Sequence, residues 1–322
     1  MIATLPEPLS RALDAELQQH DPTAIRNAAT ALSEAYRAQR GIARALSPVE
    51  RAAYLAVRFP STFAAASVVW GELARVCNLD AVRSVLDVGA GPGTASLASD
   101  GVLSDAKFSL LERDSGWRQI AGRLAQASAI DAAFRVGAVP GSIEPHDVVV
   151  AGYALNELTE NERAAAVAEL WTAARIALIV LEPGTPQGFS VCEAARTQTL
   201  AAGAHAAAPC THSEHCPMSR ADWCHQPVRL SRSASHRFAK RAALAYEDEK
   251  FSYVVLTRNP PRRLATARIV RKPIRNAGHV HLDLCDASGL NRLTVGRSDK
   301  EHYRDARAVE WGEAWPADQS GA

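Results

Sequence analysis

Residues 85–96 read VLDVGAGPGTAS, an apolar run that ends in three glycines at positions 89, 91 and 93. The apolar part predicts a buried strand, and the glycines predict a tight turn into a helix. Glycine at such a turn lets the backbone approach a nucleotide-like ligand closely, with the amino end of the next helix facing it. This stretch therefore predicts a ligand-binding loop at the end of a buried strand.

The spacing of the glycines indicates which ligand the loop binds. A dinucleotide-binding fingerprint would place its third glycine at position 94, which is Thr94 here. The pattern G-x-G-x-G with an acidic residue two positions before it is typical of class I S-adenosylmethionine-dependent methyltransferases, whose ligand has no pyrophosphate. An ordinary glycine turn is the alternative. We expect five residues of the loop to bind S-adenosylmethionine: Asp87, Gly89, Ala90, Gly91 and Gly93.

Further candidate residues for this site follow the next two predicted strands. Glu112 ends the second strand, nineteen residues after the last glycine, where a carboxylate can accept hydrogen bonds from both ribose hydroxyls. The sequence AGYALNEL ends the following strand and places Ala154 at the cofactor cleft. Tyr153 and Asn156 are the candidate catalytic residues, because methyl transfer needs mainly a group that positions the acceptor or takes its proton. Glu157 is an alternative to Asn156, and a capping or supporting role for either fits the sequence equally well.

Strands and helices alternate through the middle of the chain. Apolar runs at residues 82–90, 107–114, 146–158 and 175–189 are separated by helical patterns. Continuous Val/Ile/Leu strands of this kind indicate a parallel sheet covered by helices on both faces. A later strand, KFSYVVLTR at residues 250–258, is expected to complete the sheet as an antiparallel edge. The fold class predicted is α/β.

Composition divides the chain into three parts. Residues 1–80 are rich in Ala, Arg and Leu at helical spacing and predict a helical N-terminal cap. Residues 81–259 predict the methyltransferase-like domain, with a cysteine-rich insert at residues 207–226. A Pro-Pro-Arg-Arg break marks a linker, after which residues 260–322 read as short strands with turn signals, a small β-domain.

The bulk composition is that of a globular protein. Of the 322 residues, 47% are hydrophobic and 22% are charged. We find no apolar stretch of the roughly 18 residues needed to span a bilayer, and no signal peptide. The expectation is therefore a cytoplasmic protein with no membrane partner. In that reducing compartment, clustered cysteines bind metals more often than they form disulfides.

Positive charge is concentrated in one segment. Residues 218–275 carry fourteen Lys and Arg but only four Asp and Glu, whereas the whole chain has a net charge of +1. Such a segment indicates contact with a phosphate backbone, and a solvated basic face is the alternative. The candidate RNA-binding residues are Arg237, Lys240 and Arg241.

Three of the six cysteines lie in one short stretch, PCTHSEHCPMSRADWCH at residues 209–225. Their spacing, C-x5-C-x7-C, is wider than the C-x2-C pairs of zinc knuckles, whereas a polynuclear iron–sulfur cluster accepts thiolates from longer loops. The fourth ligand would most economically be Cys285, from HLDLCD in the small β-domain. A zinc ion held by the three thiolates and one histidine is the competing interpretation, its candidates being His212, His215 and His225. Cys77 and Cys192 are expected to be buried apolar residues without partners.

Several segments together resemble the Rsm22 family of methyltransferase-like proteins, which includes proteins of the mitochondrial small ribosomal subunit. They are LDVGAGPGTAS, AGYALNEL, LEPGTPQGF, the cysteine block with its DWCH, and RDARAVEWGEAWP, between residues 82 and 316. The resemblance implies a class I S-adenosylmethionine methyltransferase (Rossmann-like) fold. It also implies a [4Fe–4S] cluster on four cysteines: Cys210, Cys216, Cys224 and Cys285.

By that resemblance, the expected function is methyltransferase-like, on or near the small-subunit ribosomal RNA during assembly of the small ribosomal subunit. Two alternatives follow from the same residues. One is a non-catalytic, RNA-binding assembly factor that keeps the fold as a platform. The other is a zinc-containing methyltransferase of small molecules, for which the basic segment would have no role.

Overall fold

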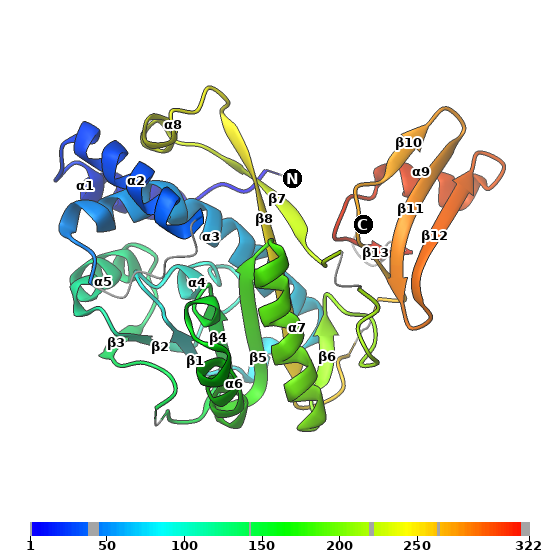
Figure 1. Ribbon diagram of the computed structural model, residues 1–322, viewed down its shortest axis with the longest axis horizontal. Helices are drawn as coiled ribbons and strands as arrows, with labels where there is room; N and C mark the ends of the chain where they lie inside the picture. Colours follow the sequence, from blue (N-terminus) through cyan, green and yellow to red (C-terminus); the bar gives the residue numbers. More distant parts are fainter. Residues whose placement is uncertain (1, 38–44, 142, 219–221, 263–264, 317–322) are drawn as a thin grey trace.

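The computed structural model describes residues 2–37, 45–141, 143–218, 222–262 and 265–316 (Figure 1). Its main sheet has eight strands, and seven of them follow the order β3-β2-β1-β4-β5-β8-β6, while β7 pairs with β8 alone. The strands are β1 (Ser84–Val88), β2 (Lys107–Glu112), β3 (Ala132–Val136), β4 (His146–Gly152), β5 (Ala174–Pro183), β6 (His205–Ala208), β7 (Gln226–Ser231) and β8 (Tyr246–Thr257).

The directions of the strands identify the fold class. Strands β1 to β5 run parallel, and β8 lies antiparallel between β5 and β6. Five parallel strands that start from the middle of the sheet, with one antiparallel strand inserted beside the last, make the class I methyltransferase fold. The predicted fold class is confirmed. The expectation that residues 250–258 form the edge was wrong, because the short β6 continues the sheet beyond β8.

Helices cover both faces of the main sheet, as alternation along the strands requires. In β1, Val85 faces one hydrophobic core and Leu86 faces the other. The second core contains α6 (Glu160–Ala173) and α7 (Pro186–Ala201). The first contains helices from the N-terminal part as well as later ones: α1 (Glu7–Leu17), α2 (Pro22–Arg37), α3 (Pro48–Val76), α4 (Thr94–Leu97) and α5 (Arg118–Ala127). The N-terminal helices thus share one core with the sheet.

Helix α3 is the central helix of the first core. It is long and apolar enough to cross a membrane by length and composition alone, so the expectation that no such stretch exists was wrong for this helix. However, 78% of its most apolar window is buried inside the protein, and Trp70 and Phe59 are almost fully enclosed. Its apolar composition is accounted for by this packing.

Strands β7 and β8 extend past the carboxyl end of β5 as a two-stranded ribbon. The last residue of β5, Pro183, pairs with Phe251, whereas β8 begins five residues earlier at Tyr246. The ribbon is joined at its far end by α8 (Ala234–Lys240), which Figure 1 shows above the sheet beside α2. We call residues 226–250 the arm. It rises from the same edge of the sheet at which the glycine turn lies.

The C-terminal part is a separate antiparallel sheet with its own small core. Strands β9, β10 and β12 pair with the long β11, and β13 pairs with β9. The elements are β9 (Ala267–Ile269), β10 (Ile274–Asn276), β11 (His279–Asp286), β12 (Gly289–Gly296), α9 (Lys300–Ala308) and β13 (Ala314–Trp315). The division into three domains at residues 80 and 260 stays a prediction.

Candidate functional site

The glycine loop follows β1 and is fixed by hydrogen bonds to β2. The backbone N–H groups of Gly89 and Ala90 both donate to the carbonyl oxygen of Leu111, at 2.9 and 3.2 Å. The N–H of Gly91 donates to Oε2 of Glu112 at 3.0 Å. The loop and the predicted ribose-binding carboxylate therefore form one hydrogen-bonded unit.

Gly89 and Gly91 have different roles in this loop. Gly89 has φ +65°, and a Cβ there would lie 2.6 Å from the Cβ of Ala154, in the loop after β4. Gly91 has φ +53°, and a Cβ there would meet nothing within 4 Å. Gly89 thus lets two loops pack together, while Gly91 presents bare backbone to open space. A cofactor that approaches the backbone closely needs this second feature.

Glu112 ends β2 with its carboxylate held in place. It is 8% exposed, and its Oε1 accepts a hydrogen bond from the N–H of Asp114 at 2.8 Å. Asp114 is in turn bound by the guanidinium of Arg51 in α3, at 2.9 Å. Each oxygen of Glu112 accepts one bond and keeps a second lone pair. The carboxylate can therefore accept hydrogen bonds from two neighbouring hydroxyls, as a ribose presents.

Asp87 lies beneath the loop. It is 1% exposed, and its Oδ2 accepts hydrogen bonds from the N–H and the hydroxyl of Ser96, at 3.0 and 2.8 Å. Burial raises its pKa to about 6, against the effect of these hydrogen bonds. The geometry shows Asp87 holding the start of α4 in place, so any contact with a cofactor would be made by its other oxygen.

The candidate catalytic residues lie in the turn after β4. Tyr153 has φ +59°, which is strained for a residue with a side chain, and its buried hydroxyl has no hydrogen-bond partner among the described residues. Burial raises the pKa of this hydroxyl well above its usual value. A strained residue with an unpartnered polar atom marks this turn as a candidate functional position.

Asn156 is tied to a residue that the sequence analysis missed. Its side-chain nitrogen donates to Oε2 of Glu182, at the end of β5, and its backbone N–H donates to Oε1 at 3.2 Å. Glu182 is fully buried, and burial raises its pKa to about 8. A carboxylate inside an otherwise apolar strand, IALIVLEP, was the available signal. Asn156 has only its carbonyl oxygen left for a substrate.

An ion pair spans the end of β1. Arg113 follows Glu112, and its guanidinium lies 3.0 Å from the carboxylate of Glu157, which belongs to the turn after β4. Since β1 lies between β2 and β4, this pair crosses above the glycine loop. Glu157, proposed as an alternative group to orient the acceptor, is therefore engaged by Arg113. Burial raises its pKa, and Arg113 partly opposes this shift.

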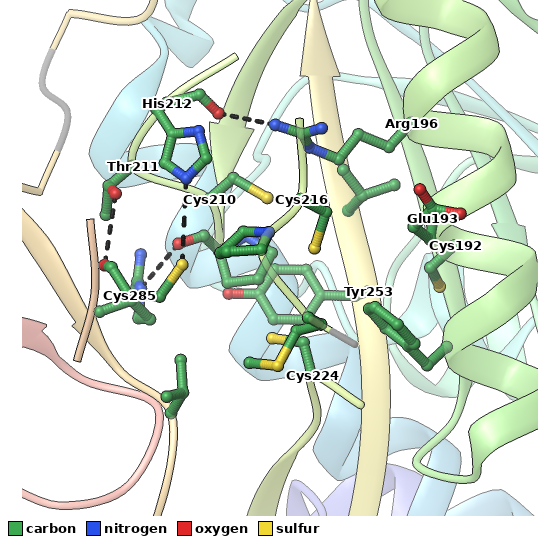
Figure 2. Close-up of a pocket in the computed structure, with 17 residues that line it drawn as sticks. Cys192, Glu193, Arg196, Cys210, Thr211, His212, Cys216, Cys224, Tyr253 and Cys285 are labelled. Atoms are coloured by element: carbon green, nitrogen blue, oxygen red, sulfur yellow. Dashed lines mark hydrogen bonds between the residues drawn. The ribbon is translucent and has the colours of Figure 1, made fainter. Parts of the chain in front are cut away.

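A second site is the pocket drawn in Figure 2. Its empty volume is about 590 Å³, part of which is open to solvent, and it lies between α7, the cysteine block and β11. The four predicted ligands all line it: Cys210, Cys216, Cys224 and Cys285. The hydroxyl of Thr211 donates to the carbonyl of Cys285 at 3.4 Å, which ties the block to the C-terminal sheet. The structure thus brings the distant fourth cysteine to the other three.

Of the three histidines predicted as alternative metal ligands, only His212 lines the pocket. His212 lines the pocket, and its Nε2 is 3.9 Å from the sulfur of Cys285. His215 is exposed, and His225 stacks against Trp223, so neither lines the pocket. Across the described ranges, no three His, Cys, Asp or Glu side chains are grouped closely enough to hold a metal ion. The sulfurs surround the pocket rather than meeting at one point.

The pocket wall contains residues that the sequence analysis missed. Cys192 was interpreted as a buried apolar residue without partners; it is 3% exposed and lines the same pocket. Three further wall residues carry a buried polar atom that has no hydrogen-bond partner in the described part of the chain: Nε of Arg196, Nδ1 of His212 and the hydroxyl of Tyr253. The Nε–H of Arg196 and the hydroxyl of Tyr253 can donate, and unpartnered buried donors are rare, so such a wall fits an anionic group.

Burial favours the protonated form of Cys216, Cys224 and Cys285. It raises the pKa of Cys285 to about 12, and the neighbouring thiols of Cys210 and Cys216 add to the effect. Burial also raises the pKa of Cys224 and Cys216, and neighbouring cysteines add to it in both cases. Binding of a metal centre to this set would release protons. Four thiols around one pocket and the unpartnered donors in its wall fit a thiolate-bound inorganic centre.

The candidate RNA-binding residues lie on and next to α8. Arg237 and Arg241 are exposed and make no ion pair among the described residues, whereas Lys240 is paired with Glu247. Much of the excess charge of residues 218–275 is similarly balanced, partly by acids outside that segment such as Glu72 and Glu310. Two of its arginines, Arg220 and Arg263, lie outside the described residues.

Comparison with known proteins identifies the family. The family model described as "Mitochondrial small ribosomal subunit Rsm22" matches residues 48–316, which include both sites. The chain belongs to the Rsm22 family. Among curated Rsm22 relatives, the human mitochondrial ribosome assembly protein METTL17 is 26% identical over 82% of this chain and 62% of its own. The Rsm22-cox11 tandem protein 2 of Schizosaccharomyces pombe is 26% identical over 85% of this chain and 44% of its own. The chain therefore spans only 44–62% of the length of these relatives.

Among solved structures, magnesium protoporphyrin IX methyltransferase from Synechocystis PCC 6803, with bound SAM, is similar at a TM-score of 0.41. It is 14% identical, and the match covers 74% of this chain and 98% of the other. At this level of similarity the match adds nothing to the fold class, which the strand order already gives.

Proposed function

We propose that this protein binds S-adenosylmethionine and acts as a methyltransferase-like factor in assembly of the small ribosomal subunit, on or near its ribosomal RNA. We further propose that it holds an iron–sulfur cluster on four cysteines. The observation that carries the cofactor assignment is the hydrogen-bonded unit of the glycine loop and Glu112 at the carboxyl end of β1. The names of its Rsm22 relatives support the role in ribosome assembly.

The charge of the loop region supports this cofactor. S-adenosylmethionine carries a sulfonium, an ammonium and a carboxylate, and it supplies an electrophilic methyl group when bound. Three carboxylates lie around the loop, from Asp87, Glu112 and Glu157, and Arg113 is paired with the last of them. A net negative surrounding favours a cationic ligand. Glu112 would accept the ribose hydroxyls, and the backbone at Gly91 would lie against the ligand.

On the acceptor side, the chain offers positioning groups. The unpartnered hydroxyl of Tyr153 can donate to or accept from an acceptor nucleotide, and Asn156 is held by Glu182 so that its remaining carbonyl oxygen is fixed. Fixed groups of this kind contribute by orienting the reactants. Tyr153 and Asn156 are proposed as the residues that contact the acceptor.

The cofactor assignment is tested by calorimetry with S-adenosylmethionine. Wild-type protein is expected to bind it, and Glu112→Gln to bind at least about tenfold more weakly, because one lost charged hydrogen bond is worth about 1.5–3 kcal/mol. Glu160→Gln, an exposed change on α6, is the matched control and should bind like wild type. Absence of binding to the wild-type protein would contradict the proposal.

A non-catalytic assembly factor is the second candidate. It is favoured by the engagement of Asn156 with Glu182 and of Glu157 with Arg113, because both groups predicted to orient the acceptor or take its proton are already bound to other side chains. Incubation with methyl-labelled S-adenosylmethionine and small-subunit precursor RNA separates the two. Label in the RNA supports the enzyme, and cofactor binding without transfer supports the non-catalytic factor.

For the cluster, the cysteines that surround the pocket favour a polynuclear centre over a single zinc ion. Anaerobically purified wild-type protein is expected to contain iron and sulfide and to absorb visible light. Cys285→Ser should lose the absorbance, while Cys77→Ser, outside the pocket, should retain it. Zinc in place of iron in the wild-type protein would refute the cluster. The cytoplasmic location stays a prediction.

A further inference from the structure

Arg196 is a buried cation without a counter-ion. It is 4% exposed, it lines the cysteine pocket from α7, and it forms no ion pair with any described residue. Arg268, in the same wall and 3% exposed, is paired with Glu72 at 2.8 Å. Burying a charge without a partner costs free energy, so the surroundings of Arg196 lack a negatively charged group.

The hydrogen bonds of Arg196 leave its buried Nε–H without a partner among the described residues. Its Nη2 donates to the backbone carbonyl of His212 at 2.9 Å, as Figure 2 shows, and to that of Glu214 at 2.7 Å. Both acceptors are neutral, and both lie in the loop between Cys210 and Cys216. The Nε–H is buried and has no partner. The guanidinium is therefore fixed in orientation while its charge and one N–H remain unmatched.

Tyr253, in another wall of the pocket, also carries a hydrogen-bond donor without a partner. It extends from β8 into the pocket, it is 5% exposed, and its hydroxyl is buried without a hydrogen-bond partner. The two unsatisfied donors belong to residues on different elements, α7 and β8, that line one pocket surrounded by four cysteines. A hydrogen-bond acceptor with negative charge, placed between them, would satisfy both.

We propose that Arg196 is the counter-ion of an anionic thiolate-bound cluster in this pocket, that Arg196 Nε and the Tyr253 hydroxyl donate hydrogen bonds to its sulfur atoms, and that both raise its reduction potential. This inference rests on the proposed iron–sulfur site. Four thiolates around a [4Fe–4S] core give a net charge of about −2, and about −3 after one-electron reduction. A fixed cation and fixed donors stabilise the more negative form more strongly, which makes reduction easier.

Tyr253→Phe and two changes at Arg196 test the proposal. Tyr253→Phe removes only the hydroxyl. Arg196→Gln removes the charge, and Arg196→Lys keeps it while losing the forked geometry. Two controls lie outside the pocket: Tyr303→Phe on α9, and Arg163→Gln on α6, whose guanidinium also binds two backbone carbonyls. The readout is the midpoint potential of the anaerobic protein, titrated with dithionite and followed by electron paramagnetic resonance.

The expected order of potentials is wild type highest, then Arg196→Lys, then Arg196→Gln, with Tyr253→Phe also below wild type and both controls unchanged. Unchanged potentials in cluster-loaded Arg196→Gln and Tyr253→Phe would overturn the inference while leaving the cluster in place. If Arg196→Gln holds no iron but Arg196→Lys does, the counter-ion role is supported, because only the lysine keeps the charge. Equal loss of iron in both would contradict it. Zinc in the wild-type protein would overturn the cluster and the inference together.

Discussion

At the scale of single residues, Gly89 combines two constraints. Its backbone is left-handed, and it is in close contact with Ala154, so a side chain would be both strained and obstructed. The contact joins the loop after β1 to the loop after β4, and the proposed cofactor site lies beside these two loops. A single methyl group at this position would therefore separate two sides of one site.

Gly89→Ala is expected to lower the free energy of unfolding by about 1–3 kcal/mol, through strain and the clash with Ala154. Gly122→Ala in α5 is the control, since a Cβ there meets nothing within 4 Å, and it should be neutral or stabilise by up to about 1 kcal/mol. Urea denaturation measures both. Equal stability of the two variants would show that the close contact is not a constraint in solution.

Glu182 predicts a dependence of stability on pH. Its folded-state pKa is raised to about 8, above its ordinary value of 4.5. Between these two pKa values the native state holds a proton that the unfolded state releases. The contribution of Glu182 to the free energy of unfolding is therefore fully present below about pH 4.5 and is lost as pH rises through 8. Glu182→Gln should remove roughly 1–3 kcal/mol of that decline between pH 6 and 9, measured by urea denaturation. Glu160→Gln, an exposed change on α6, should keep the wild-type slope; a wild-type slope in Glu182→Gln would contradict the assignment.

The residues that could be predicted from the sequence are those with local signals. The three glycines and Glu112 follow apolar strands at fixed spacing, and the cysteines of the block are close together in the chain. Glu182 and Arg196 could not be predicted in the same way. Their roles depend on partners from other elements, which meet them only in the folded protein.

At the scale of elements, strand existence was easier to predict than strand position. The long apolar runs became β1, β2, β4, β5 and β8. Strand β6 has only four residues, HAAA, and β3 has five, so neither has enough residues for a pattern to stand out. Because β6 was missed, β8 was placed at the edge. Pairing between distant strands is a property of the whole sheet, which local hydrophobicity does not encode.

The arm carries the prediction about RNA. Arg237→Glu with Arg241→Glu reverses two exposed charges, on and directly after α8, that make no ion pair with any residue the structure describes. Affinity for small-subunit RNA is expected to fall at least about tenfold, and the slope of log affinity against log salt concentration to decrease by roughly one per lost phosphate contact. Filter binding at several salt concentrations measures both quantities.

The control is the double change Arg297→Glu with Arg304→Glu, two exposed arginines of the C-terminal part. It alters net charge equally. If both double variants lose the same affinity and the same slope, net charge alone would account for binding, and the arm would have no specific role.

At the scale of the whole molecule, Arg268 joins parts that are distant in sequence. Its guanidinium donates to Glu72 of α3 at 2.8 Å, to the carbonyl of Pro209 in the cysteine block at 2.9 Å, and to the carbonyl of Gly312 near β13 at 2.9 Å. One buried side chain thus connects the N-terminal helices, the pocket loop and the C-terminal sheet.

Arg268→Met is expected to destabilise the protein by about 3–5 kcal/mol, because it removes three buried hydrogen bonds from a charged donor, although Glu72 keeps its ion pair with Arg75. Arg292→Met, which breaks an exposed pair with Asp283, should cost no more than about 1 kcal/mol. Urea denaturation compares the two. Limited proteolysis should also release the C-terminal sheet faster from Arg268→Met; similar behaviour of both variants would exclude this connecting role.

The place of Cys285 in the chain has a consequence for how the protein is made. It follows Cys224 by 61 positions, yet both line one pocket. At about 5–20 residues per second, translation exposes the first three thiols roughly 3–12 s before the fourth. During that interval the nascent chain is open to adventitious metal and oxidation. Binding of the proposed centre by all four thiols therefore has to wait until β11 has been made.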